Sequence, residues 1–190
     1  MVNIVNLVAT GDLGRECDLR ALSEDLDLPS LKYEPETFPG LQIRLESEGA
    51  FMALFFSGTY TITGVTSESE MENFVSKVIN EIEALGLKIE DINPPEIKNL
   101  VCKGDLKREF DLSALTLALG VERTEYEPEQ SPFVYYWPEE VDCLITIPSN
   151  GEVIITGVQT RSDAEDAFNY LREKIQSLYP GRPDSSNSTN

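Results

Sequence analysis

The pattern of apolar and polar positions predicts several strands and a short helix in the first part of the chain. Residues 4–10 are apolar and strand-like, and Asp18 is placed to cap a short helix that begins at the next residue. The segment Tyr33-Glu34-Pro35 is expected to be a short strand or turn, interrupted by its proline. A meander of three strands is then predicted over residues 41–45, 51–56 and 59–65.

A long amphipathic helix follows this meander. Ser67 is its expected N-cap, and Glu70, three residues later, completes a capping-box pattern. The helix should extend to about Leu85, because its apolar positions keep a helical spacing: Met71, Phe74, Val75, Val78, Ile79, Ile82 and Leu85. A turn is expected near residues 46–49. The predicted unit is therefore β-α-β-β-β-β-α.

The same unit occurs twice in the chain. At an offset of 93 residues, about 25 of 63 aligned positions are identical without a gap. The second copy ends in a helix expected over residues 162–178. We therefore predict a tandem duplication, with a first repeat at residues 1–88 and a second at residues 89–179. Residues 180–190 are rich in Ser and Asn, and we expect them to form a disordered tail.

Each repeat has too few helices to cover both faces of its sheet. Two helices can pack on one face of an antiparallel sheet, which leaves the other face uncovered. The segment 51–56 is nevertheless apolar on both faces, since Phe51, Ala53 and Phe55 alternate with Met52, Leu54 and Phe56. Either another part of the chain covers the second face, or that face is built for a partner.

Composition narrows the functions that this fold can serve. The 190 residues include 34 acidic and 15 basic side chains and no histidine, so the formal net charge is −19 at pH 7. The lack of histidine excludes histidine-based acid–base catalysis and His-ligated metal sites. The acidic excess is typical of a surface adapted to a salt-rich cytoplasm and would ordinarily oppose binding to a polyanion.

Cysteine usage and apolar runs point to a soluble protein inside the cell. The three cysteines, Cys17, Cys102 and Cys143, lie far apart and match no zinc-binding or redox spacing, which fits a reducing compartment. No basic segment of the signal-peptide kind opens the chain. The longest apolar run, residues 50–56, is far too short to span a bilayer. We therefore expect a cytoplasmic protein with no membrane partner.

Over residues 3–178 the chain resembles the TATA-box-binding protein family in its archaeal form. The resemblance rests on Asn-Leu-Val in the first strand of both repeats and on Thr-Gly at the end of the fifth strand of both. Tyr-Glu-Pro-Glu also occurs in both, followed in the first repeat by Phe-Pro-Gly. The implied fold class is α+β, with two tandem β-α-β-β-β-β-α repeats forming a saddle-shaped curved antiparallel sheet that carries its helices on the convex face.

The resemblance also implies a function without catalysis or cofactor. Members of this family are general transcription initiation factors that bind the minor groove of TATA-box promoter DNA, bend it and recruit transcription factor B. The expected location is then the archaeal cytoplasm, in association with the nucleoid. Because the second face of the sheet is apolar, the sequence leaves open whether the protein self-associates when no DNA is bound.

Nine residues match positions that contact DNA in this family: Asn6, Val8, Phe38, Arg44, Phe55, Thr63, Asn99, Val101 and Thr156. The resemblance assigns the two asparagines and two threonines to polar contacts with the central base pairs, and the two valines to apolar contact with base edges. It assigns the two phenylalanines to insertion between base pairs, and the arginine to a phosphate. Two acids of the second repeat, Glu127 and Glu129, match the segment that binds transcription factor B.

The second repeat departs from the family pattern where DNA contact is expected. Ser131 stands in place of Phe38, Pro148 in place of Phe55, and Trp137 in place of Arg44. The nearby Phe133 is a candidate substitute for the missing rings. These departures keep open an alternative function, that of a diverged paralogue acting as a regulator or protein-interaction module with weak or no TATA binding. A third alternative, an enzyme or small-molecule binder, has no supporting motif.

Overall fold

The computed structural model of the chain describes residues 1–45, 49–89 and 92–179. The described chain forms two compact units, which we call the first half (Val5–Asn99) and the second half (Met1–Ile4 together with the residues from Leu100 onward). The first four residues thus group with the second half, although the repeat alignment places them in the first repeat. The turn expected at residues 46–49 falls mostly outside the described residues, as does the tail expected at residues 180–190.

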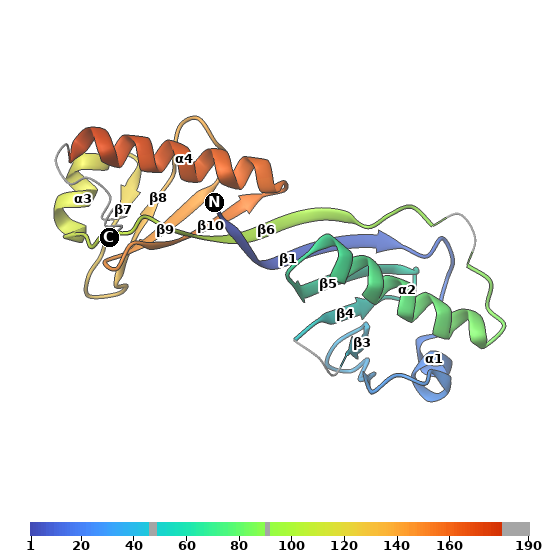
Figure 1. Cartoon of the computed structure of the whole chain (residues 1–190). Coiled ribbons are helices and arrows are strands. Elements are labelled where there is room, and N and C mark those ends of the chain that lie inside the picture. The colour runs from blue at the N-terminus through green and yellow to red at the C-terminus, as the bar shows by residue number, and fades with distance from the viewer. Residues whose placement is uncertain (46–48, 90–91, 180–190) are drawn as a thin grey trace, which may run out of the picture. The chain divides into compact units, whose positions relative to one another are not determined.

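The first half has the predicted order of elements (Figure 1). These are β1 (Asn3–Asp12), α1 (Leu19–Asp25), β2 (Ser30–Lys32), β3 (Leu41–Arg44), β4 (Phe51–Leu54), β5 (Thr59–Val65) and α2 (Glu68–Ala84). The strands lie side by side in the order β2-β3-β4-β5-β1, and neighbouring strands are antiparallel. Of the strand or turn expected at residues 33–35, the structure has the turn, because the Glu34 carbonyl accepts hydrogen bonds from the N–H groups of Thr37 and Phe38. The short strand β2 lies just before it and ends at Lys32.

The second half repeats this arrangement. Its elements are β6 (Glu96–Asp105), α3 (Leu112–Leu119), β7 (Thr124–Glu125), β8 (Phe133–Tyr136), β9 (Leu144–Pro148), β10 (Glu152–Val158) and α4 (Arg161–Leu178), and only the first four residues of β6 group with the first half. The strand order is β6-β10-β9-β8-β7, which corresponds strand for strand to the order in the first half. The predicted α+β class and the duplicated β-α-β-β-β-β-α unit are therefore confirmed.

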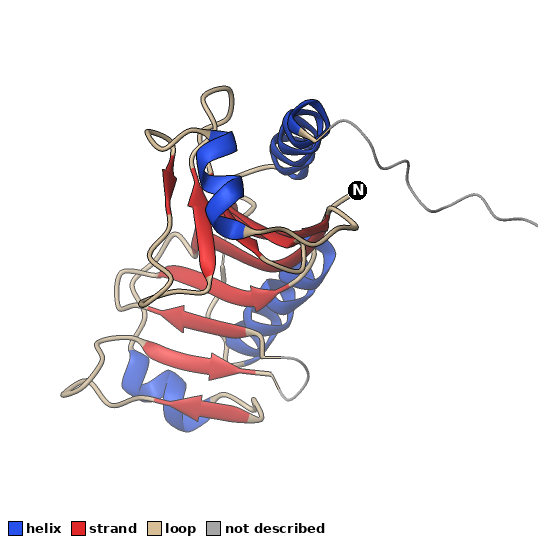
Figure 2. Ribbon diagram, turned by 90° about the vertical axis from the view of Figure 1, so that its left-hand side faces the viewer, coloured by secondary structure: helices blue, strands red, loops and turns tan. Residues whose placement is uncertain are grey.

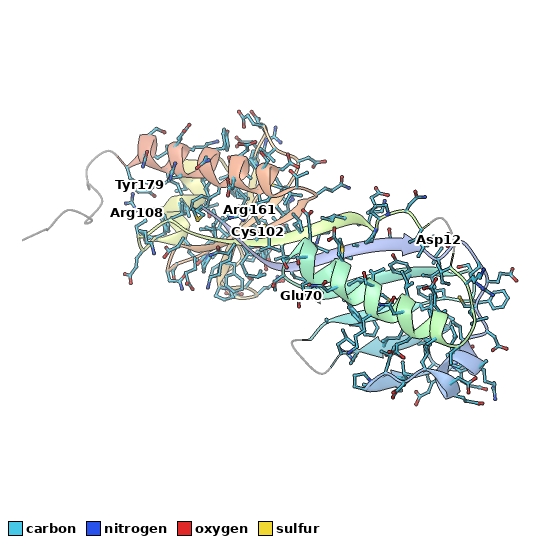
Figure 3. All side chains as sticks on the ribbon, turned by 45° about the vertical axis from the view of Figure 1, so that its right-hand side comes forward. Asp12, Glu70, Cys102, Arg108, Arg161 and Tyr179 are labelled. Atoms are coloured by element: carbon cyan, nitrogen blue, oxygen red, sulfur yellow. The ribbon has the colours of Figure 1, made fainter. Side chains whose placement is uncertain are left out.

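Polar side chains begin the helices at the expected places. The Asp18 carboxylate accepts from the backbone N–H groups of Arg20 and Ala21, and the Ser67 hydroxyl accepts from that of Glu70 at 3.1 Å. The capping box differs in one detail, because the Glu70 carboxylate accepts from the N–H of Thr66 at 2.7 Å and not from that of Ser67. Helix α4 begins one residue before the prediction, at Arg161 (Figure 3).

In each half the helices lie on one side of the strands (Figure 2). The apolar stripe of α2, including Phe74, Val78 and Ile82, is buried against the sheet side that carries Met52 and Leu54. Phe51 and Phe55 alternate along the chain with Met52 and Leu54, so they lie on the other side of the sheet, and they remain half-buried. The prediction that Phe56 shares the side of Met52 and Leu54 is wrong: β4 ends at Leu54, and the following turn leaves 59% of Phe56 exposed.

The helices of the described chain are all unsuited to crossing a membrane, since none combines the necessary length with a sufficiently apolar sequence.

Candidate nucleic-acid interface

Side chains on the helix-free side of the first-half strands form a surface that we call the first-half face. Paired residues of antiparallel strands project to the same side, so the strand register identifies its members. One row across the strands consists of Lys32, Gln42, Ala53, Thr61 and Thr10. A second row consists of Ser30, Arg44, Phe51 and Thr63. Most of these residues are half-buried or exposed, so their side chains are accessible to a partner. Most of them are apolar or carry a hydroxyl group, and few are charged.

Asn6 is held in place by the end of the fifth strand. Its amide oxygen accepts a hydrogen bond from the N–H of Gly64 at 2.8 Å and another from the Thr63 hydroxyl at 3.3 Å. Strand β5 carries an extra residue at this point, and Gly64 adopts a φ of 80°. A Cβ at Gly64 would collide with the carbonyl oxygen of Gly49. Since the oxygen of Asn6 is occupied, its amide nitrogen is left to act as a donor to a ligand.

Phe38 and Phe55 come together at one end of the first-half face. Their ring centroids are 5.9 Å apart and their planes are tilted by 54°. Phe38 follows a turn in which its N–H donates to the Glu34 carbonyl at 2.9 Å, and the N–H of Phe55 donates to the Thr59 carbonyl at 2.9 Å. Both rings are half-buried, so each has one surface against the protein and one available to a partner.

A shallow hollow lies beside the Phe55 ring. It is lined by the hydroxyl-bearing residues Thr10, Thr59 and Thr61 and by the acids Asp12 and Glu96. The hollow therefore continues the apolar and hydroxyl character of the face and adds two acidic residues to it.

Arg44 is an exposed basic side chain of the first-half face. Its guanidinium carbon lies 4.7 Å from the centroid of the Phe51 ring, a cation–π distance that fixes the side chain over the face. Its planar group retains donors suited to a phosphate. Lys32, which is on the same side, is paired with Glu34 at 3.0 Å.

The second-half face is defined in the same way. Its main row consists of Glu125, Tyr135, Thr146, Ile154 and Lys103. Of the predicted residues, Val101 is paired directly with Thr156, and both are half-buried. Asn99 is half-buried in β6, and Val8 is half-buried in β1 of the first half. The structure thus brings together Asn6 with Thr63, Phe38 with Phe55, and Val101 with Thr156.

The departures of the second repeat have structural consequences. Ser131 shares a hydrogen bond of 3.0 Å with the Tyr135 hydroxyl, and Pro148 is paired in register with Phe133. Lys103 forms an ion pair with Glu152 at 3.0 Å, which neutralises the one basic side chain of the main row. Trp137, at the position of Arg44, is 41% exposed and offers aromatic surface where the first half offers a cation.

Glu127 and Glu129 lie in a turn before β8 and are exposed. The Glu127 carbonyl accepts from the N–H groups of Gln130 and Ser131, both at 2.9 Å, and its carboxylate accepts from the Gln130 side chain. The equivalent turn of the first half is built by the Glu34 carbonyl in the same way. The second-repeat turn therefore presents acidic side chains on a fixed backbone.

Three contributors to the faces were missed by the sequence analysis. These are the contact between Arg44 and the Phe51 ring, the Lys103–Glu152 ion pair, and the space that Gly40 leaves beside the rings of Phe38 and Phe55. Gly40 could have been found by comparing the repeats, since Phe133 replaces it in the second. The other two contacts join different strands, and they depend on a strand register that a single sequence does not specify.

Comparison with known proteins supports the predicted resemblance. The family model described as Transcription factor TFIID (or TATA-binding protein, TBP) matches residues 1–85 and 94–178. The TATA-box-binding protein C of Halobacterium salinarum is 38% identical over 178 residues, covering 93% of this chain and 98% of the relative. The TATA-box-binding protein 2 of Haloferax volcanii is 33% identical over 177 residues, covering 93% and 94%. Methanococcus jannaschii TBP, a solved structure, matches with a TM-score of 0.83 at 34% identity, covering 93% of this chain and 98% of that one.

Proposed function

Because the chain belongs to the TATA-box-binding protein family, we propose that it is a general transcription initiation factor that binds the minor groove of TATA-box promoter DNA, bends it and recruits transcription factor B. The observation that carries this proposal is the first-half face. It combines the amide of Asn6, which is held through its oxygen, with half-buried apolar side chains and a pair of half-buried phenylalanine rings. The protein acts by binding and needs neither a catalytic group nor a cofactor.

Each part of the face suits the minor groove of A·T-rich DNA. The bases there present mainly acceptors, so the amide nitrogen of Asn6 is a matching donor. Val8 is a half-buried apolar side chain near that amide in β1, and it would exclude the amino group that guanine adds to the groove. Phe38 and Phe55 supply an apolar wedge, whose insertion unstacks one base-pair step and kinks the duplex. Arg44 is placed for a phosphate. By the repeat alignment, Asn99, Val101 and Thr156 take the corresponding roles in the second repeat.

The proposal predicts that the ring pair is essential for DNA binding. We expect the double variant Phe38→Ala/Phe55→Ala to lose at least tenfold in affinity for a TATA duplex, since it removes the wedge. The measurement is fluorescence anisotropy with a TATA duplex and a scrambled duplex. Because Phe56 is exposed and directly follows Phe55 in the sequence, Phe56→Ala is the matched control and should bind like the unmodified protein. Equal affinity of all three proteins for the TATA duplex would contradict the proposal.

The acidic turn of the second half is the surface that we assign to transcription factor B. Glu127 and Glu129 are exposed on a backbone fixed by two hydrogen bonds, so they can pair with basic side chains of a partner without reordering the turn.

A second candidate function rests on the second-half face. The paired Lys103, the exposed Trp137 and the lack of a phenylalanine at positions 131 and 148 favour a diverged paralogue with weak or no TATA binding. Absence of specific binding by the folded protein at every salt concentration would support that function in place of the first.

A further inference from the structure

The two halves hold their wedge positions on the same backbone scaffold. Phe38 donates its N–H to the Glu34 carbonyl at 2.9 Å, and Ser131 donates its N–H to the Glu127 carbonyl at 2.9 Å. The residues stand 93 positions apart, which is the offset of the repeat. The difference between the two ends therefore lies in the side chains that these turns present.

In the first half, a glycine makes room for the ring pair. A Cβ added at Gly40 would lie 2.8 Å from the Phe38 ring and 3.1 Å from the Phe55 ring. These are distances at which one of the rings would have to move. The pair in its observed position, with centroids 5.9 Å apart, thus depends on the missing side chain of Gly40.

In the second half, all three of these positions have changed together. Phe133 occupies the place of Gly40, Ser131 that of Phe38, and Pro148 that of Phe55. The Ser131 hydroxyl is hydrogen-bonded to the Tyr135 hydroxyl, and Phe133 lies within strand β8 opposite Pro148. The turn therefore presents a small polar side chain, and the phenylalanine belongs to the strand.

The charges of the second-half face also make it less able to open a base-pair step. Opening a base-pair step costs a few kcal/mol, which contacts with the surrounding DNA must offset. The main row of the second-half face carries Glu125 where the first half has Lys32, and its Lys103 is paired with Glu152. This face consequently attracts phosphates less than the first-half face, which has the exposed Arg44.

We propose that the protein opens only the base-pair step contacted by its first half, and that the second half lies against the minor groove without inserting a side chain. This inference rests on the proposed binding to TATA-box DNA and adds that the deformation is one-sided. The protein would then need a flexible pyrimidine–purine step at one end of its site only. The expected bend is about half of the ~80° kink of the two-wedge family member.

The experiment measures unstacking at each end of the TATA element separately. The base analogue 2-aminopurine, whose fluorescence rises when it is unstacked, is placed at one end of the duplex or at the other. The orientation of the bound protein is read by energy transfer from a dye at one DNA end to a dye on Ser69→Cys or, in a second preparation, on Ser162→Cys. These exposed serines are equivalent positions of the two repeats, and the native cysteines Cys17, Cys102 and Cys143 are buried from the labelling reagent.

We expect a several-fold rise in fluorescence at the end contacted by the first half, and no rise at the other end. The variant Phe38→Ala/Phe55→Ala should lose the rise, and the control Phe56→Ala should keep it. Replacing the flexible step should lower affinity at the first-half end and leave it unchanged at the second-half end.

A comparable rise at both ends, in a complex that binds the TATA duplex specifically, would overturn the one-sided deformation and leave the proposed function intact. If Phe133→Ala then removed the rise at the second end, that phenylalanine would be the second wedge. Failure of the folded protein to bind the TATA duplex at all would instead overturn the proposed function together with this inference.

The structure also specifies how a second wedge could be rebuilt. The triple variant Ser131→Phe/Phe133→Gly/Pro148→Phe restores all three positions to the first-half pattern, and it should add a fluorescence rise at the second-half end. Its folding is checked by circular dichroism. If it does not fold, the comparison of the two ends with the unmodified protein still decides the question.

Discussion

At the scale of single residues, Tyr170 on α4 shows how one contact changes the acidity of a group. Its hydroxyl is hydrogen-bonded to the Glu140 carboxylate. This hydrogen bond, and to a smaller extent the desolvation of the phenol, raises the pKa of Tyr170 to about 12. Tyr136 and Lys174 lie in the same cluster, with the Lys174 ammonium donating to the Tyr136 hydroxyl at 3.1 Å. Loss of the Tyr170 proton would remove the bond to Glu140 and place two negative charges side by side.

This pKa shift predicts how folding stability depends on pH. Because the pKa of Tyr170 is higher in the folded protein than the ordinary value of about 10, its contribution to stability is complete below about pH 10. The contribution is then lost as the pH rises to about 12. We expect Tyr170→Phe to show a smaller fall in melting temperature over this range than the unmodified protein. The measurement is thermal unfolding followed by circular dichroism.

The control for this prediction is Tyr33→Phe, which removes a phenol of the first half that is remote from Glu140 in the sequence and belongs to the other unit. It should reproduce the pH dependence of the unmodified protein. If the melting temperature of Tyr170→Phe fell as far as that of this control over the same pH range, the hydrogen bond to Glu140 would have no influence on stability at alkaline pH.

At the scale of elements, the two Tyr-Glu-Pro-Glu turns offer an internal comparison for partner binding. Both are fixed by a glutamate carbonyl that accepts two backbone hydrogen bonds. We expect Glu127→Ala/Glu129→Ala to weaken the complex with transcription factor B on TATA DNA by about tenfold or more, because it removes two exposed charges from the assigned surface. The binding of DNA alone should change little. The measurement is titration of purified transcription factor B into the protein–DNA complex.

The matched control changes the equivalent acids of the first half, Glu34→Ala/Glu36→Ala. It alters the net charge by the same amount and should leave the affinity for transcription factor B unchanged. Equal losses from both variants would mean that the partner responds to the overall acidity of the protein, and the assignment of the second-repeat turn would be wrong.

The elements themselves were largely predictable, and the exceptions have local causes. Strand β5 has the predicted bounds, and the caps Asp18 and Ser67 act as expected, since periodicity and capping depend on neighbouring residues. Strand β4 ends two residues early because the chain turns after Leu54. The sequence pattern could not place that end, because apolar residues continue through Phe56.

At the scale of the whole molecule, the net charge of −19 sets the problem that DNA binding must overcome. Even lysines on the two faces are paired with carboxylates, Lys32 with Glu34 and Lys103 with Glu152. Ordinary DNA-binding proteins gain affinity by releasing cations from phosphates, so their binding weakens as salt rises. In this protein, we expect cations to lie between the acidic surface and the phosphates.

The expected result is that affinity for the TATA duplex stays constant or increases from roughly 0.2 to 3 M KCl, because bound cations screen the repulsion between the two anionic molecules. The measurement is fluorescence anisotropy at each salt concentration, with the scrambled duplex as control. A steep decrease, with the ordinary slope of about −0.9 for each neutralised phosphate, would show that direct contacts with basic side chains dominate.

The duplication, the order of the elements, the caps and the family resemblance could all be derived from the amino-acid sequence, because each follows from residue types at fixed spacing. Which side chains contact one another could be learned only from the folded chain. The bond from Gly64 to Asn6 spans 58 positions, and the Phe38–Phe55 pair, the Arg44–Phe51 contact and the Lys103–Glu152 ion pair likewise join different segments. These contacts depend on strand register, on the extra residue in β5 and on the space left by Gly40, and these features exist only once the strands have paired.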